Sequence, residues 1–122
     1  MKTQNEMVIM SIYLSSTDRF HGSLLYEAIT IEAKNFGIDG ATVFHGQMGF
    51  GASSRLKSDK FWEMVSKVPV VIELIDDRKK LERFAYRVKS WFEEVQKGFL
   101  ITISPVEILL SKEDILPPGQ EI

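Results

Sequence analysis

The sequence predicts an α+β domain with the ferredoxin-like order of elements, namely strand, helix, strand, strand, helix, strand. Its 122 residues fit one domain, and 44% hydrophobic with 26% charged residues is typical of a globular chain. Four short apolar runs have the length and composition of strands. Two longer stretches repeat apolar residues every three or four positions, as amphipathic helices do. We therefore expect two helices on one face of a four-stranded antiparallel sheet.

The first half of the chain supplies a strand, a helix and a second strand. Residues 7–14 are apolar at almost every position, which predicts a strand buried on both faces. A polar loop is expected over residues 15–22. Ser23 is a candidate N-cap for a helix over about 24–36. The second strand is expected over residues 41–45.

The second half repeats this order from a third strand onward. Residues 70–75 follow a proline and are expected to form that strand. A long helix to about residue 97 follows, capped by Asp76 or Asp77. Its apolar residues recur on one face, which predicts packing against the sheet. The last strand is expected over residues 99–104.

Three stretches are less regular. Residues 58–65 fit either a short helix or an extended excursion, and residues 106–110 are a candidate extension of the last strand. The tail, residues 111–122, contains Pro-Pro-Gly and is expected to fray. The whole chain is therefore expected to form a single domain with its core over about 7–110.

The predicted sheet has one face that no helix covers. Strands over 7–14, 70–75 and 100–104 offer apolar residues to both faces. Exposed apolar patches of that size usually mark an interface. We therefore expect copies of the same chain to cover this face, in an assembly with closed cyclic symmetry.

A glycine-rich stretch over residues 46–55 follows the second predicted strand. Its glycines, hydroxyls and arginine are Gly46, Gly49, Gly51, Ser53, Ser54 and Arg55. Glycine allows φ > 0 and a close approach of the backbone to a ligand. Successive backbone N–H groups can form an anion-binding concavity, which hydroxyls and an arginine would reinforce. The alternative is a surface loop without a ligand, and the spacing matches neither the dinucleotide nor the P-loop fingerprint.

The predicted topology places further polar residues at the same end of the sheet. Arg19, His21, Lys97 and Gly98 are expected near the glycine-rich stretch, where the cations could contact an anion. For Arg19 and His21, the alternative is a network with Asp18 and Glu27 that stabilises their own loop. His21 and His45 could also meet, but two histidines without a carboxylate are a weak basis for a metal site, and none is predicted.

Composition argues against several classes of function. The 15 basic and 17 acidic residues give a net charge of −2, which argues against electrostatic binding to nucleic acid. Without cysteine there is no disulfide framework and no thiolate zinc site. No apolar run reaches the ~20 residues that span a membrane, and no signal-peptide pattern opens the chain, so a cytosolic protein is expected.

Ser53 and Ser54 are the only candidate nucleophiles near a histidine, and no third group is evident to orient one, so no enzyme activity is predicted.

Several motifs occur together in the pattern of one family. They are Tyr13-Leu14, Asp18-Arg19-Phe20-His21-Gly22, Leu25-Tyr26-Glu27-Ala28, Gly40-Ala41-Thr42-Val43, the glycine-rich stretch and Val68-Pro69-Val70-Val71-Ile72-Glu73. From about Met7 to Leu110, the chain resembles the DUF190 branch of the PII-like signalling proteins.

The resemblance implies a ferredoxin-like homotrimer that binds an adenine nucleotide in clefts between subunits. A loop over about 47–60 would change conformation with the ligand and dock onto a partner protein, a membrane protein being one candidate. The turn over residues 96–99 would be a second phosphate-contacting loop. The expected nucleotide-binding residues are Gly46, Gly49, Phe50, Gly51, Ser53, Ser54, Arg55, Lys97, Gly98, Arg19 and His21.

Two departures from PII proteins bear on the identity of the ligand. The turn over 96–98 is shorter and poorer in glycine, and residues 106–110 lack the basic side chains that hold the outer phosphates in PII proteins. We therefore expect ADP or AMP rather than ATP, and no cofactor. The alternatives are a ligand-free interaction module and a metal-binding or small hydrolytic protein, between which fold analogy cannot decide.

Overall fold

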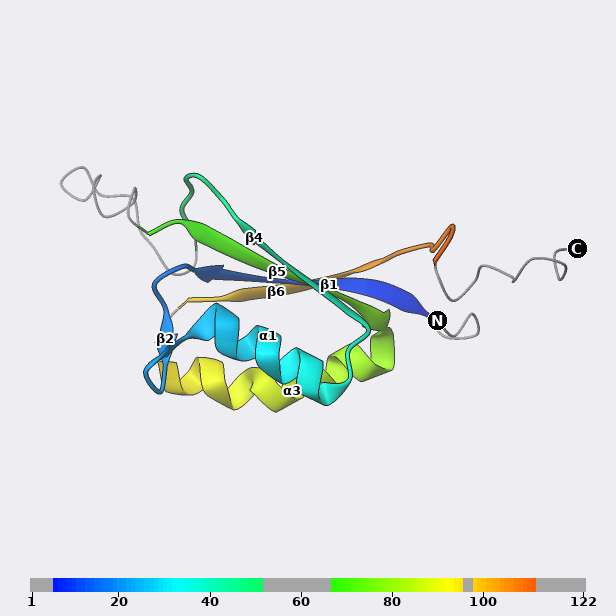
Figure 1. Ribbon diagram of the computed structural model, residues 1–122, viewed down its shortest axis with the longest axis horizontal. Helices are drawn as coiled ribbons and strands as arrows, with labels where there is room; N and C mark the ends of the chain where they lie inside the picture. Colours follow the sequence, from blue (N-terminus) through cyan, green and yellow to red (C-terminus); the bar gives the residue numbers. More distant parts are fainter. Residues whose placement is uncertain (1–5, 52–66, 96–97, 112–122) are drawn as a thin grey trace, which may run out of the picture.

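The chain forms two layers, a twisted sheet and a pair of helices (Figure 1). A computed structural model describes residues 6–51, 67–95 and 98–111. The elements are β1 (Met7–Ser15), β2 (Arg19–Phe20), β3 (Ser23–Leu24), α1 (Leu25–Phe36), β4 (Gly40–His45), β5 (Pro69–Asp77), α3 (Arg78–Val95) and β6 (Leu100–Pro105). The stretch over 58–65 and most of the tail lie outside the described residues.

The main sheet has four antiparallel strands in the order β4-β5-β1-β6. Both helices pack against the same face (Figure 1). The predicted ferredoxin-like fold is therefore confirmed. The last strand ends at Pro105, so the candidate extension over 106–110 is wrong. Beyond it, the Val106 N–H donates one further hydrogen bond to the Met7 carbonyl oxygen, at 3.1 Å.

The hydrophobic core lies between the helices and one face of the sheet. Alternate residues of the central strands point into it, as the period of two in a strand requires. The helices contribute residues at steps of three and four, which is the helical period. The most buried of these side chains, each at most 2% exposed, are Val8, Ile12, Leu25, Ile29, Ala33, Val70, Ile72, Leu74, Leu81, Phe84, Val88 and Phe92.

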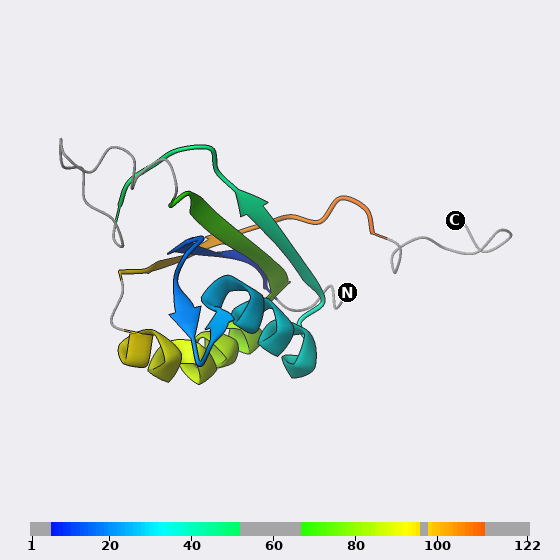
Figure 2. The ribbon, with the colours of Figure 1, turned by 60° about the vertical axis from the view of Figure 1, so that its left-hand side comes forward.

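A hairpin occupies part of the segment expected to be a polar loop. Arg19 pairs with Leu24, and Phe20 pairs with Ser23. The two residues between them, His21 and Gly22, have φ of 49° and 83°, as a two-residue type I′ turn requires. Figure 1 and Figure 2 show this hairpin, in blue, at the end of the helical layer where α1 begins and α3 ends.

The hairpin also changes how α1 begins. The predicted N-cap, Ser23, is wrong because Ser23 is paired in β3; the capping position is Leu24, which makes no side-chain capping bond. The Leu25 N–H instead donates to the backbone carbonyl of Asp18, at 2.8 Å. A backbone acceptor thus takes the place of the expected hydroxyl.

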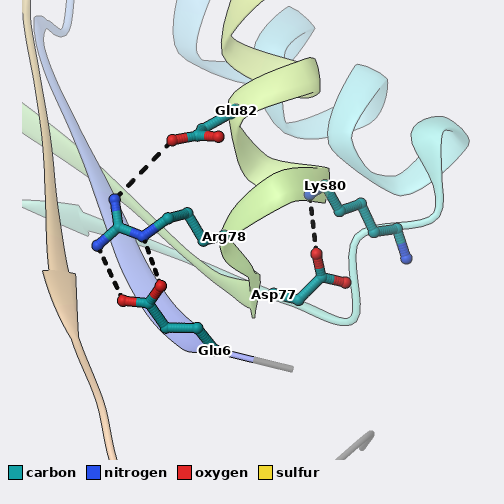
Figure 3. A network of polar contacts seen from close by, with 5 residues as sticks. All are labelled: Glu6, Asp77, Arg78, Lys80 and Glu82. Carbon is teal, nitrogen blue, oxygen red and sulfur yellow. Dashed lines mark hydrogen bonds and ion pairs between the residues drawn. The ribbon is translucent and has the colours of Figure 1, made fainter. Parts of the chain in front are cut away.

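Asp77 caps α3, one of the two residues predicted for that role. Its Oδ1 accepts a hydrogen bond from the Lys80 N–H at 2.9 Å, which satisfies one of the free donors of the first turn (Figure 3). Asp76 is buried and serves another purpose. Its Oδ2 accepts from the Asp39 N–H at 3.0 Å, which ties the start of β4 to the end of β5.

The cap at Asp77 can be tested by substitution. We expect Asp77→Ala to lower the free energy of unfolding by about 1 kcal/mol, because the Lys80 N–H loses its acceptor. Asp77→Asn keeps a capping oxygen and should stay within about 0.5 kcal/mol of the wild type. Urea denaturation measures both values, and equal stability of the alanine and wild-type proteins would contradict the assignment.

Arg78 fastens the start of β1 to the start of α3. Its Nε and Nη2 donate to the two carboxylate oxygens of Glu6 at 2.9 and 3.1 Å, and its Nη1 lies 3.9 Å from Glu82 (Figure 3). The hydrogen bond with Glu6 raises the pKa of Arg78, so the guanidinium stays charged. The Arg78 N–H also donates to the Glu6 carbonyl oxygen at 2.9 Å. The contacts between Glu6 and Arg78 therefore fix the residue before β1 to the first residue of α3.

The other face of the sheet is uncovered in the single chain, and we call it the open face. Residues opposite one another in the ladders share a face, so the open face consists of cross-strand rows. From one end these rows are Phe44-Val71-Tyr13-Leu100, Thr42-Glu73-Ser11-Thr102, Gly40-Ile75-Ile9-Ser104 and the pair Asp77-Met7. The expectation that residues 7–14 are buried on both faces is thus wrong for the single chain, in which Tyr13 is 42% exposed.

No helix among the described residues is long and apolar enough to cross a membrane.

Candidate functional site

The first part of the glycine-rich stretch lies against the start of β5. The Gly46 N–H donates to the Pro69 carbonyl oxygen at 2.8 Å. A Cβ added to Gly46 would lie 2.7 Å from Pro69 Cγ, and one added to Gly49 would lie 3.1 Å from the same atom. Both glycines therefore allow a close approach of two backbone segments. The left-handed conformation occurs elsewhere, since the described glycines with positive φ are Gly22 and Gly37.

This close approach predicts a difference between two glycines of the same loop. Gly46→Ala should lower the free energy of unfolding by about 1–3 kcal/mol, because the added methyl group forces Pro69 or the loop to move. Gly51→Ala is the matched control, since its Cβ would meet no described atom within 4 Å. It should change stability by less than about 0.5 kcal/mol. Urea denaturation compares the two, and equal losses would contradict the role assigned to Gly46.

A cavity of about 280 Å³ lies beside this loop, at the end of the sheet. The end of β1, the end of β4 and the starts of β5 and β6 all meet there (Figure 1). Its lining comes from four segments: Tyr13, Leu14 and Ser15; Gly49, Phe50 and Gly51; Lys67, Val68 and Pro69; and Phe99 and Leu100. Segments that are distant in sequence thus build one site, as the predicted topology required.

The lining is mainly apolar and contains three aromatic side chains, Tyr13, Phe50 and Phe99. Ser15 adds a hydroxyl, and Lys67 is the only cationic residue among the described lining residues. Apolar walls with a few polar groups are typical of small-molecule sites. This lining can enclose a planar apolar ring and offers one cation to an anionic group.

A turn rich in hydroxyl groups holds in place the part of the cavity wall formed by Ser15 and Val68. The Ser16 N–H donates to the Val68 carbonyl oxygen at 2.9 Å, and the Val68 N–H donates back to Ser16 Oγ at 3.2 Å. The buried carboxylate of Asp18 accepts from the Ser15 N–H at 3.1 Å. These bonds fix the end of β1 against the residues that lead into β5. This part of the wall is therefore in place before a ligand binds.

The structure brings together some of the predicted site residues. Gly49, Phe50 and Gly51 line the cavity, and Gly46 holds the loop to β5. Gly98 precedes the lining residue Phe99 in the chain. The remaining predicted residues of these loops, Ser53, Ser54, Arg55 and Lys97, lie outside the described residues.

Arg19 and His21 lie elsewhere, on the hairpin against α3. The Phe20 ring stacks on Trp91 with centroids 4.6 Å apart, and His21 Nε2 lies 2.5 Å from Glu94 Oε2. Arg19 Nη1 donates to the Gly22 carbonyl oxygen at 3.1 Å. Neither residue lines the cavity. Arg19 thus contacts its own loop, as in the alternative weighed from the sequence, whereas the partner of His21 is Glu94 of α3, which that alternative did not include.

The two histidines contact different partners. The imidazole of His45 meets the ring of Tyr26 edge to face, with centroids 5.1 Å apart, whereas His21 pairs with Glu94. Among the described residues, no group of three or more His, Asp or Glu side chains could hold a metal ion. The described part of the chain therefore gives no support to the metal-binding alternative.

The sequence did not single out most of the cavity walls. Ser15 and Leu100 belong to no motif, and Leu14 and Val68 occur in family motifs but were not predicted to contact a ligand. The one available signal was topological, since the end of the first strand and the start of the third were expected at the end of the sheet that carries the glycine loop.

These features define an α+β ferredoxin-like domain with a loop-lined cavity at one end of its sheet. The chain belongs to the DUF190 family, described as an "Uncharacterized ACR", whose model matches residues 7–108. Two relatives are named UPF0166 proteins. One, from Aquifex aeolicus, is 32% identical over 83% of this chain and 91% of its own length. The other, from Methanocaldococcus jannaschii, is 33% identical over 82% of this chain and 89% of its own length.

Among solved structures, the fold is similar to that of CPII from Thiomonas intermedia K12, described as a nitrogen regulatory PII-like protein. The structure of CPII bound to ADP, AMP and acetate has a TM-score of 0.61 at 12% identity, over 85% of this chain and 89% of the other. The structure bound to ADP, AMP and bicarbonate has a TM-score of 0.59 at 12% identity, over 84% and 87%. The similarity confirms the PII-like fold.

Proposed function

We propose that this protein is a PII-like signalling protein that binds an adenine nucleotide in the cavity beside the glycine loop. The ligand changes the conformation of the loop over 47–60 and thereby controls a partner protein in the cytosol. The observation that carries the proposal is the cavity itself, where the loop base meets the ends of β1, β5 and β6. Its aromatic and apolar lining suits a purine ring. The ADP and AMP bound to CPII are consistent with this choice.

The open face supports a homotrimer in which the cavity is a cleft between copies. Tyr13 and Leu100 line the cavity and also belong to the first row of the open face, where they are 42% and 51% exposed. A copy packed on that face would therefore add a wall to the site. At about 280 Å³, the cavity of one chain lies just below the ~300–1,000 Å³ typical of ligand pockets. A shared cleft would hold the ligand more completely.

The charges near the cavity favour a nucleotide with few phosphates. Lys67 is the cation among the described lining residues, and Arg55 and Lys97 are the cations of the glycine-rich stretch and the turn over 96–99 that are expected to contact the ligand. Each phosphate added brings negative charge that needs a charge-assisted partner. ADP or AMP is therefore proposed in preference to ATP.

Isothermal titration with AMP, ADP and ATP tests the proposal. We expect one nucleotide per chain, with ADP or AMP bound more tightly than ATP. Trypsin digestion in the same solutions reports on the loop, since Arg55, Lys57 and Lys60 are cleavage sites. Their cleavage rate should change when ADP is present. A folded protein that releases no heat with any of the three nucleotides, and is cleaved equally with and without them, would contradict the proposal.

A further inference from the structure

One of the aromatic rings of the cavity is fixed by the core. Phe99 lies between α3 and β6, and its ring stacks on Phe92 with centroids 4.2 Å apart and an interplanar angle of 21°. Phe92 is 2% exposed, so the ring behind Phe99 cannot move freely. Phe99 itself is 40% exposed and lines the cavity. The fold therefore presents to a ligand in the cavity an aromatic ring that a second, buried ring holds in place.

The other two aromatic residues are less suited to hold a ring in place. Phe50 lies between Gly49 and Gly51 and is 69% exposed, so ordering its side chain on a ligand would cost conformational entropy. Tyr13 belongs to the open face, which the proposed assembly covers. Phe99 is thus the aromatic lining residue that the core of the same chain holds in place.

We propose that Phe99 is the residue on which the nucleotide base stacks, an assignment that rests on the proposed function. The Phe92–Phe99 pair then sets the preference of the site for a ligand that carries a base over other phosphate compounds. The role follows from a π surface that is already in place, because a prepositioned group loses little freedom on binding. Phe99 is a specificity-determining residue in this proposal, and Phe92 is a positioning residue.

Calorimetry of ADP binding tests the assignment. Phe99→Leu should weaken ADP binding by about tenfold to a hundredfold, since stacking of a base on an aromatic side chain contributes that much. Phe99→Trp keeps a π surface and should bind ADP within about threefold of the wild type. Tyr86→Leu is the control, since Tyr86 lies on α3 and is 79% exposed, and it should leave ADP affinity unchanged. Phe99→Leu with wild-type affinity, or Phe99→Trp as weak as Phe99→Leu, would overturn the assignment.

A second measurement does not depend on how a variant folds. In the wild-type protein with bound ADP, the H2 and H8 protons of adenine should show nuclear Overhauser effects to the ring protons of Phe99. Effects to Phe50 or Tyr13 alone would overturn the assignment while leaving the proposed function intact. If the wild-type protein binds no ADP at all, the proposed function fails, and that result is distinct from the failure of Phe99 as the stacking residue.

Discussion

Replacing Phe84 by alanine is expected to lower the free energy of unfolding by about 3–5 kcal/mol. Phe84 on α3 is fully buried, and its ring meets Phe36 of α1 edge to face with centroids 5.5 Å apart. The substitution removes the largest side chain at the centre of the helix–sheet contact and leaves a cavity that the backbone cannot close. Since a small domain is stable by only about 5–15 kcal/mol, the loss would be a large share of the total.

A second aromatic residue on the same helix provides the control. Tyr86 lies two positions further along α3 but is 79% exposed, so Tyr86→Ala should change stability by less than about 0.5 kcal/mol. Urea denaturation followed by circular dichroism measures both variants under the same conditions. Similar losses for the two substitutions would show that α3 does not turn the predicted face toward the sheet.

The contrast between these residues also explains why the fold could be predicted. Apolar positions recur along α3 with the helical period, and β5 alternates buried and half-buried residues as a strand on a core must. The observed helices, Leu25–Phe36 and Arg78–Val95, begin and end within a few residues of the predicted limits. Both patterns are set by local chemistry, so they can be read without knowledge of the tertiary contacts.

The hairpin formed by β2 and β3 could not be predicted in the same way. Each strand has two residues, which is too short to show alternation. Its type I′ turn places His21 at φ 49°, a position where asparagine or glycine is usual, so the turn signal was weak. What holds the hairpin is tertiary, namely the stacking of Phe20 on Trp91. This contact also explains why Arg19 and His21 lie against α3 and away from the cavity.

The cavity lies at the end of the sheet that the sequence indicated, and only part of its lining was expected. The glycine-rich stretch and the expected topology indicated one end of the sheet, and the cavity lies there. Its walls are backbone and apolar side chains such as Leu14 and Val68, whose identity does not distinguish them from core residues. The close contact of Gly46 with Pro69 depends on how two distant segments meet. Such features appear only once the chain is folded.

A positive charge on the open face is expected to abolish assembly. Ile9 and Ile75 are paired across β1 and β5 in the third row of that face, and both are half-buried in the single chain. Ile9→Lys would place an ammonium group in the proposed interface. No Lys or Arg lies in the described rows of this face, and the carboxylates of Glu73 and Asp77 lie in the rows on either side of Ile9, diagonal to it. Desolvating an ammonium group costs more than a diagonal ion pair returns, and a net loss of about 3 kcal/mol weakens association by about a hundredfold or more.

Sedimentation velocity measures the result, and Tyr86→Lys provides the matched control, since the same lysine is placed on the exposed side of α3. The wild type and Tyr86→Lys should sediment as trimers, and Ile9→Lys as a monomer. Ile9 does not line the cavity, so Ile9→Lys leaves its described lining residues unchanged. If the cleft is shared between copies, the monomeric variant binds ADP more weakly than the wild type. A monomer that binds ADP with wild-type affinity would show that one chain holds the ligand alone, and a trimeric Ile9→Lys protein would show that the open face is not the interface.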